Sequence, residues 1–287
     1  MKISRRAALF GLLALVLVAG ALLLMAAAQR SRDRFHYYTG GESAELAGLL
    51  EAHGYELREL QVAPDARLRG IVRLPSSDGA RFVLFFPGNA EPQLDVTLPT
   101  LEALRAGRDL GIAAFTYRGF DGATGTPSPQ AAEDDARAQL RYLHEQLLVP
   151  VERVVIVGYS MGSGIALRLP AALSREQQPP AALILLSPYW TLELGPASRF
   201  ELFLPSEYYR VADVAGEYKG PVLVVAGARD EALPVDQHAR KLIRALHPSS
   251  QYWELRDRGH VDYLRDTSLL ARIGSFALDS TALRDNR

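Results

Sequence analysis

Ser160, Asp230 and His260 are the residues whose types and order in the chain could do chemistry together. A serine hydroxyl is a poor nucleophile until a base takes its proton, and an acid must orient that base. The chain supplies these groups in the order serine, acid, histidine, as expected when the partners lie in loops at the carboxyl ends of later strands. We therefore expect acyl transfer in which Ser160 attacks a carbonyl carbon, His260 moves the proton and Asp230 holds the imidazole tautomer.

The segment around Ser160 predicts a strand, a sharp turn and a helix. Residues 154–157 are an apolar run, the pentapeptide 158–162 is Gly-Tyr-Ser-Met-Gly, and residues 163–169 have a helical pattern. Glycines two positions before and after the serine let the backbone fold back without a side-chain clash and lift the hydroxyl clear of the sheet. Because the pentapeptide alone is common by chance, its position between a strand and a helix carries the prediction.

Asp230 and His260 each follow a predicted strand. Asp230 lies in the loop after 222–226, and His260 lies in the loop after 252–255. Each residue alone is weak evidence, since loop aspartates are commonly turn residues. Rival residues are the acids Glu231 and Asp236, and the histidines His36, His53, His144, His238 and His247 in helices, at a helix end or near the N-terminus. The joint placement after successive strands favours Ser160, Asp230 and His260.

An acyl-transfer site also needs donors for the oxyanion that forms at the carbonyl. The backbone N–H of Met161 is the expected first donor, because it opens the helix after the serine and lies at the helix N-terminus. The second donor is expected in the loop after the strand 81–86, where residues 87–90 are Pro-Gly-Asn-Ala. Asn89 N–H is the predicted donor, with Ala90 N–H as the alternative.

Strands and helices alternate along most of the chain. The early segments 57–62 and 68–74 have the pattern of half-buried strands. The later strands are short apolar runs, as a parallel sheet covered on both faces requires, at 81–86, 112–117, 154–157, 182–186, 222–226 and 252–255. Helices are expected at 44–53, 98–104, 131–148, after Ser160, at 235–246 and at 262–276, with Leu140, Leu143, Leu147 and Leu148 on one face of 131–148. The sequence predicts an α/β fold with a mostly parallel eight-stranded sheet.

Together these motifs resemble those of the α/β-hydrolase superfamily, most of all its membrane-associated, depalmitoylase-like branch and related bacterial hydrolases. Besides 158–162, the matching motifs are Pro87-Gly88-Asn89-Ala90, Tyr117-Arg118-Gly119-Phe120, Gly125-Thr126-Pro127-Ser128, Gly227-Ala228-Arg229-Asp230 and Gly259-His260. The match runs from about Leu57 to Phe276 and implies an α/β-hydrolase fold with a Ser-His-Asp triad. Pro87 stands where relatives commonly have histidine. Because proline fixes φ and lacks an N–H, the oxyanion loop is expected to be set differently. For Arg118, a paired arginine that supports its loop is favoured over a substrate contact.

Residues 187–220 interrupt the alternation of strands and helices. The segment begins Ser-Pro-Tyr-Trp and is rich in aromatic and large apolar side chains, among them Phe200, Phe203, Leu204, Tyr208 and Tyr209. It follows a strand that should end beside the serine. Two interpretations stay open: a small cap that lines an apolar substrate pocket, or a surface excursion that packs on its own domain.

Composition excludes several classes of protein. The 287 residues, 48% of them hydrophobic, suit one α/β domain, or one domain plus an appendage, and a formal net charge of −1 suggests no basic surface for nucleic acid. The absence of cysteine rules out disulfides, thiolate metal sites and a cysteine nucleophile. Since the histidines show no paired ligand spacing and triad chemistry needs no cofactor, neither a metal nor a cofactor is expected.

The first residues form a segment apart from the predicted fold. Residues 7–28 are uncharged, and as a helix they would be about 33 Å long, enough to cross a hydrocarbon core of about 30 Å. This run predicts a membrane anchor over 1–28. We expect a connector over 29–55 and a hydrolase domain over 56–287, with that domain outside the cytoplasm and, in a bacterium, in the periplasm. The alternative is a signal peptide with a cleavage site at Ala26-Ala27-Ala28, which would release a secreted protein.

Three functions compete on these residues. The leading hypothesis is a serine hydrolase that cleaves esters or thioesters of an apolar, lipid-like acyl group. A peptidase that removes N-terminal residues would use the same fold, and its candidate amine-binding carboxylates are Glu193, Glu201 and Glu207. A catalytically silent, membrane-anchored binding domain would be expected to have lost the serine or the histidine, and both are present. The triad therefore favours the hydrolase.

Overall fold

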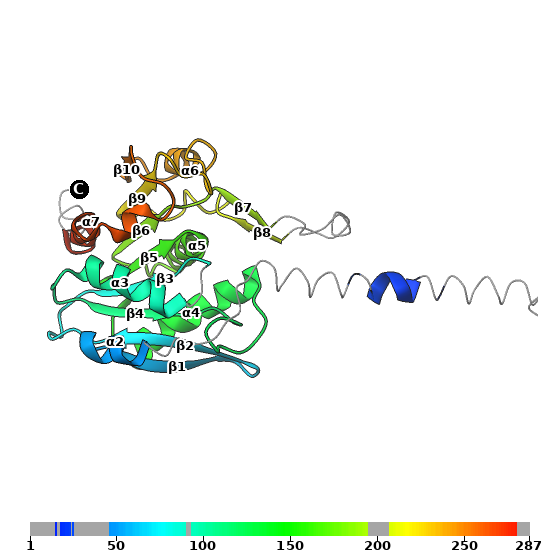
Figure 1. Ribbon diagram of the computed structural model, residues 1–287, viewed down its shortest axis with the longest axis horizontal. Helices are drawn as coiled ribbons and strands as arrows, with labels where there is room; N and C mark the ends of the chain where they lie inside the picture. The colour runs from blue at the N-terminus through cyan, green and yellow to red at the C-terminus, as the bar shows by residue number, and fades with distance from the viewer. Residues whose placement is uncertain are drawn as a thin grey trace, which may run out of the picture. The chain divides into compact units, whose positions relative to one another are not determined.

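One eight-stranded sheet organises the fold, in the order β1-β2-β4-β3-β5-β6-β9-β10 (Figure 1). The computed structural model describes residues 46–89, 93–194 and 207–279, together with short helical pieces between 15 and 25. The strands of the sheet are β1 (Glu56–Ala63), β2 (Ala66–Arg73), β3 (Phe82–Phe86), β4 (Gly111–Phe115), β5 (Val154–Tyr159), β6 (Ala182–Leu186), β9 (Val222–Gly227) and β10 (Gln251–Leu255). The pairs β1–β2 and β2–β4 are antiparallel, and the other pairs are parallel. The predicted sheet is confirmed.

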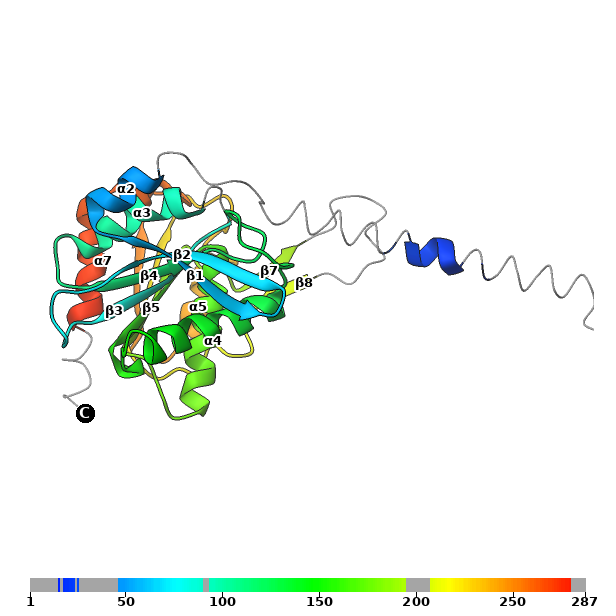
Figure 2. The ribbon, with the colours of Figure 1, turned by 90° about the horizontal axis from the view of Figure 1, so that it is seen from below.

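Helices cover both faces of this sheet. Figure 2 shows α2, α3 and α7 on one side and α4 and α5 on the other. The helices are α2 (Leu46–His53), α3 (Gln93–Arg105), α4 (Pro129–Glu145), α5 (Met161–Arg175), α6 (Ala239–Ala245) and α7 (Thr267–Asp279), with 3-10 turns at Val151–Arg153 and Asp262–Arg265. Because both faces are covered, β3, β4, β6 and β9 are buried along their whole length. This explains their short, continuous apolar sequences.

The core on the α3 and α7 side is made by alternate residues of the strands. Val83 and Phe85 of β3 belong to one cluster of buried side chains with Leu101 of α3 and Ile273 of α7. The helix on the opposite face begins where its sequence requires. Ser128 has extended backbone angles, its hydroxyl accepts a hydrogen bond from Ala131 N–H at 3.0 Å, and a proline occupies the first turn of α4. A serine cap followed by proline is a strong helix start.

Three predicted features differ from the structure. Strand β1 lies at the sheet edge and has no fully buried residue; Leu60 and Val62 are partly buried between exposed neighbours, so the predicted half-burial of 57–62 holds only for the second half of the segment. Helix α4 ends at Glu145, and Leu148 is 81% exposed with a φ of 55°, so it is not on the apolar face that was expected to run to 148. The segments 235–246 and 262–276 each begin with turns, and their α-helices start only at Ala239 and Thr267.

Two predictions concern residues that are largely outside the described part. Most of residues 7–28 lies there, and within the described residues no helix has the length and hydrophobicity needed to span a membrane. The predicted cap contains β7 (Thr191–Leu194) and β8 (Glu207–Arg210), which form a separate two-stranded sheet. Residues 195–206 between these strands lie outside the described residues, so the lining of a pocket by this segment stays a prediction.

Candidate active site

Ser160, His260 and Asp230 form a continuous line of hydrogen bonds. Ser160 Oγ lies 2.9 Å from His260 Nε2, and His260 Nδ1 lies 2.7 Å from Asp230 Oδ2. The three residues follow β5, β10 and β9, whose parallel arrangement brings their carboxyl ends to one edge of the sheet. The Asp230 side chain is 1% exposed and the His260 side chain 20%. The acid is therefore shielded from water, while the imidazole is partly exposed.

The backbone around Ser160 is strained and closely packed. Ser160 has φ 50° and ψ −117°, outside the regions that L residues prefer. A Cβ on Gly158 would lie 2.4 Å from the Ala166 Cβ, and a Cβ on Gly162 would lie 2.2 Å from the Phe86 carbonyl oxygen. Both positions therefore require glycine, and the turn presents the serine at the N-terminus of α5, as the sequence predicted.

Two hydrogen bonds fix the Asp230 carboxylate. Its Oδ2 faces His260, and its Oδ1 accepts from Leu233 N–H at 2.7 Å. The loop that carries Asp230 runs against the loop that carries His260, because Arg229 N–H donates to the Arg258 carbonyl at 2.9 Å. The rival Asp236 instead pairs with Arg240, and of the six histidines only His260 contacts Ser160 among the described residues.

The structure places the expected first oxyanion donor at the start of a helix. Met161 is the first residue of α5 and is 3% exposed. Asn89 is described and half-buried, whereas its alternative Ala90 lies outside the described residues. The loop of Asn89 starts at Pro87, whose carbonyl accepts a buried hydrogen bond of 2.7 Å from the Tyr117 hydroxyl. This bond, unforeseen from the sequence, ties the proline-containing loop to the loop after β4.

Arg118 is a paired arginine, as its favoured interpretation required. Its guanidinium makes a bidentate contact with the Asp135 carboxylate, at 2.9 Å from Nε and 2.7 Å from Nη2. The two side chains are 14% and 3% exposed. Burial raises the pKa of Asp135, although the hydrogen bonds and charge of Arg118 oppose that effect. The pair connects the loop after β4 to α4 and so stabilises that loop.

Three further hydrogen bonds and one ring contact lie near the triad and were not predicted from the sequence. Ser187 Oγ donates to the His260 carbonyl at 3.1 Å and contacts the Tyr263 hydroxyl at 2.9 Å. The Tyr159 ring stacks obliquely against the His260 imidazole, with 5.5 Å between centroids. His238 Nδ1 accepts from Trp190 N–H at 3.3 Å. One sequence signal could have found Ser187: it is a polar residue directly after a buried strand, at the same sheet edge as the triad.

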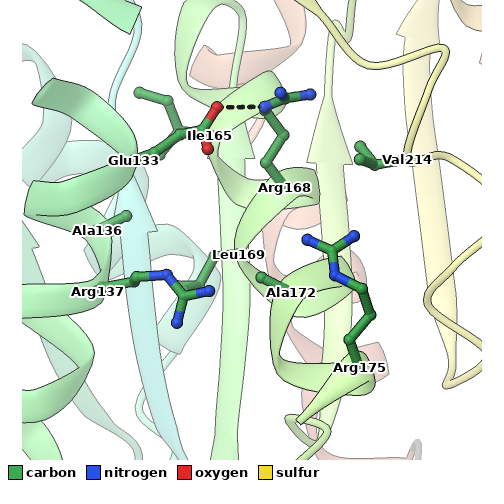
Figure 3. Close-up of a pocket in the computed structure, with 9 residues that line it drawn as sticks. All are labelled: Glu133, Ala136, Arg137, Ile165, Arg168, Leu169, Ala172, Arg175 and Val214. Carbon is green, nitrogen blue, oxygen red and sulfur yellow. Dashed lines mark hydrogen bonds and ion pairs between the residues drawn. The ribbon is translucent and has the colours of Figure 1, made fainter. Parts of the chain in front are cut away.

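A small hollow lies between α4 and α5 and includes none of the triad side chains (Figure 3). Its volume is about 80 Å³, and arginine side chains dominate its rim. Each of these arginines has a carboxylate partner: Arg137 with Glu176, Arg168 with Glu133 and Asp213, and Arg175 with Glu217. The positive charge is thus already neutralised, and the hollow is not an anion site. Within the described residues, no group of three or more His, Cys, Asp or Glu could hold a metal ion.

The chain is similar in sequence to proteins of several organisms. A model of the alpha/beta hydrolase family matches residues 83–216. An uncharacterized protein of Mycobacterium tuberculosis is 34% identical over 161 residues, which cover 54% of this chain and 55% of that protein. Protein bem46 of Schizosaccharomyces pombe is 26% identical over 192 residues, which cover 64% of this chain and 63% of that protein. The chain therefore spans little more than half the length of the curated relatives it matches.

Solved structures share the same fold. An esterase from Pyrococcus furiosus matches with a TM-score of 0.63 at 18% identity, covering 84% of this chain and 97% of that chain. A serine hydrolase without a lid from Xanthomonas campestris matches with a TM-score of 0.55 at 20% identity, covering 79% and 94%. At these identities the likeness establishes the architecture of the sheet and helices.

Proposed function

We propose that this chain, an α/β hydrolase by its fold and by the family model that it matches, is a serine hydrolase that cleaves carboxylic ester or thioester bonds. The observation that carries the proposal is the line of hydrogen bonds from Asp230 through His260 to Ser160. A nucleophile, its base and an acid that orients the base are the groups that acyl transfer needs. Their order in the chain is the one expected for this fold.

In the acylation step, Ser160 Oγ attacks the carbonyl carbon while its proton moves to His260 Nε2. Asp230 keeps the second ring nitrogen protonated and stabilises the imidazolium that forms. The N–H groups of Met161 and Asn89 hold the negative oxygen of the tetrahedral intermediate. The intermediate then expels the alcohol or thiol, which takes the proton from His260 Nε2, and an acyl ester remains on Ser160.

In the deacylation step, water takes the place of the departed group. His260 Nε2 removes a proton from this water as the oxygen attacks the acyl carbon, and the same two N–H groups hold the second oxyanion. Collapse of that intermediate breaks the bond to Ser160 Oγ, which regains its proton from His260. The carboxylic acid leaves and the enzyme returns to its starting state.

An apolar acyl group is the substrate class that we propose. The segment 187–220 supports this choice, since it is rich in aromatic and large apolar side chains and leaves the end of β6 next to the nucleophile strand β5. Neighbours of the same fold are described as an esterase and as a serine hydrolase without a lid. Residues 7–28, which are apolar and uncharged, would hold such a site near lipid.

A fluorophosphonate probe tests the reaction class. The wild-type protein should be labelled, and Ser160→Ala should abolish labelling and lower ester hydrolysis by about 10⁴- to 10⁶-fold. Ser249→Ala is a matched control, because Ser249 Oγ also lies 2.7 Å from a histidine, His247, in an exposed turn. That variant should keep full labelling. Folded wild-type protein that resists the probe would contradict the proposal.

A substrate panel separates this proposal from its rivals. We expect hydrolysis of acyl esters and acyl thioesters, with a rate that increases with chain length up to a limit set by the pocket. Faster cleavage of aminoacyl amides would favour the peptidase. A stable protein that is inert toward every acyl substrate would favour the silent binding domain.

We also propose that residues 7–28 anchor the protein in a membrane with the hydrolase domain on the extracytoplasmic side. The length and apolar character of this run support an anchor. The full chain should then remain in the membrane pellet after alkaline carbonate extraction, and its mass should include residues 1–28. Release of a shorter protein into the soluble fraction would identify a cleaved signal peptide instead.

A further inference from the structure

Ser187 combines burial with an unfavourable backbone conformation. It directly follows β6, is 1% exposed, and has φ 43°, in a region that non-glycine residues rarely adopt. Such strain persists only where the surrounding structure over-determines it, and it is concentrated at functional sites. The strained conformation therefore suggests that the contacts of Ser187 serve the neighbouring site.

The dipeptide 186–187 contacts all three segments that carry the triad. The Leu186 carbonyl accepts from Ser160 N–H at 2.9 Å, and Ser187 N–H donates to the carbonyl of Val225, on the strand that leads to Asp230, at 2.8 Å. Ser187 Oγ lies 3.1 Å from the His260 carbonyl oxygen. The order of β5, β6 and β9 in the sheet makes this possible, because β6 lies between the other two strands (Figure 1).

The direction of the hydrogen bonds around Ser187 follows from the chemistry of the groups. A carbonyl oxygen only accepts, so Ser187 uses its single hydroxyl proton on the His260 carbonyl. The contact of 2.9 Å between Ser187 Oγ and the Tyr263 hydroxyl then has Tyr263 as the donor. Tyr263 is 0% exposed, so water does not compete for its proton. A one-way chain therefore runs from Tyr263 through Ser187 to the backbone of His260.

These hydrogen bonds restrain the backbone of the His260 loop, which Asp230 does not restrain. The carboxylate of Asp230 orients the imidazole at Nδ1, but it does not fix the backbone of the loop from which His260 projects. The His260 carbonyl accepts from Ser187 Oγ and, at the longer distance of 3.5 Å, from the Tyr159 hydroxyl. Both donors belong to the central strands β5 and β6 or directly follow them. They hold the His260 loop to the rigid part of the sheet.

We propose that Ser187 is a positioning residue: its hydroxyl, oriented by Tyr263, fixes the backbone of His260 so that Nε2 stays within hydrogen-bond distance of Ser160. The role rests on the proposed function of the triad. Small displacements of a catalytic base are expensive, since about 1 Å can cost about 100-fold in rate. Ser187 acts on His260 and not on the substrate, so its loss lowers kcat and leaves KM unchanged.

Two substitutions at position 187 distinguish the effect of the hydroxyl from the effect of the backbone strain. Ser187→Ala removes the hydroxyl and keeps the strained φ, whereas Ser187→Gly removes the hydroxyl and relieves the strain. We expect kcat for an acyl ester to fall about 10- to 100-fold in both variants, with KM within about twofold of wild type. Tyr263→Phe should lower kcat in the same direction by a smaller factor, because the Ser187 hydroxyl remains but loses its orientation.

A spectroscopic readout follows the position of His260 without any turnover. The short His260 Nδ1–H···Asp230 bond should give a far-downfield proton resonance in the NMR spectrum of the wild-type protein. We expect this resonance to broaden or move upfield in Ser187→Ala and Ser187→Gly, and to be unchanged in the control variant Ser249→Ala.

The outcomes distinguish this role from a structural one and from failure of the proposed function. Wild-type kcat in Ser187→Gly together with a loss in Ser187→Ala would overturn the proposal, because strain and not the hydroxyl would then be responsible. An unchanged resonance in both variants would overturn it as well. If the wild-type protein hydrolyses no ester, the proposed function fails, and the shift of the resonance still decides whether Ser187 positions His260.

Discussion

The phenol oxygen of Tyr117 lies 2.7 Å from the carbonyl oxygen of Pro87 and donates a buried hydrogen bond to it. Pro87 begins the loop of the expected oxyanion donor Asn89. Beyond that loop, Asp121 Oδ2 accepts from Leu94 N–H at 2.9 Å, at the start of α3. The loop after β4 thereby holds the loop after β3 on both sides of the expected donor.

Tyr117→Phe should weaken the oxyanion donor without disturbing the triad. The Pro87 carbonyl loses its buried donor, which should cost about 1–3 kcal/mol of unfolding free energy. A displaced Asn89 N–H should lower kcat by about 10-fold, less than the 100- to 1,000-fold lost when a donor is removed outright. Urea unfolding and ester hydrolysis measure the two effects. Tyr142→Phe, at a half-buried tyrosine, should leave kcat unchanged, and an equal loss there would refute the assignment.

Gly162→Ala should destabilise the protein and abolish activity. The new Cβ would lie 2.2 Å from the Phe86 carbonyl oxygen and 2.5 Å from that of Pro87, so backbone must move. Overpacking of this kind costs about 1–3 kcal/mol or more. Gly79→Ala is the matched control, since a Cβ there meets no atom within 4 Å; it should shift stability by less than about 0.5 kcal/mol. Thermal unfolding curves that coincide for the two variants would contradict the close packing of the turn.

Asp230→Asn and Asp236→Asn test which acid serves His260. Asparagine at 230 can still accept from Leu233 N–H, but its amide favours the wrong imidazole tautomer, and kcat should fall by about 10⁴-fold. Asp236 is 77% exposed and pairs with Arg240, and exposed pairs contribute about 0–1 kcal/mol. Its variant should keep wild-type kcat. Steady-state kinetics measure both variants. If Asp236 were the acid, Asp236→Asn would lose activity and Asp230→Asn would keep wild-type kcat.

His238 should make stability depend on pH. Burial lowers the pKa of His238 below 6.5, its ordinary value, although the charge of Asp230 opposes this. The folded protein therefore resists protonation at this site more than the unfolded chain does. This contribution to stability is complete above about pH 6.5 and is lost as pH falls through the lower folded-state pKa.

His238→Gln isolates that contribution, because a neutral amide oxygen can still accept from Trp190 N–H at any pH. The difference in melting temperature between wild type and variant should be constant above pH 7 and change in favour of the variant toward pH 5. A difference that stays constant over the whole range would show that His238 is not the titrating group.

The sequence was sufficient for the parts of the site that depend on strand order. Short apolar runs predicted buried parallel strands, and the polar residues directly after them, Ser160, Asp230 and His260, were therefore expected at one sheet edge. The structure brings these three side chains together. The need for glycine at positions 158 and 162 could also be predicted, since a sharp turn between strand and helix leaves no room for a side chain.

Contacts between residues far apart in the chain could not be predicted from the sequence. Ser187 and Tyr263 are 76 residues apart, and nothing in either segment identifies the other. The bond from Tyr117 to Pro87 joins two loops through a carbonyl group, which every residue possesses. The end of α4 and the exposure of β1 were missed for a related reason. Leucines and alternating patterns indicate burial only if a neighbouring element is present to cover them.

The place of His260 in the chain has a consequence for folding. It follows β10, which among the described residues is the last strand in the chain, lies at the sheet edge and pairs with β9 alone. His260 can therefore reach Ser160 only after β10 has docked against β9. Edge units also open locally more easily than central strands. If the proposed function is right, ester hydrolysis should therefore be lost at lower denaturant concentrations than those that unfold the central strands.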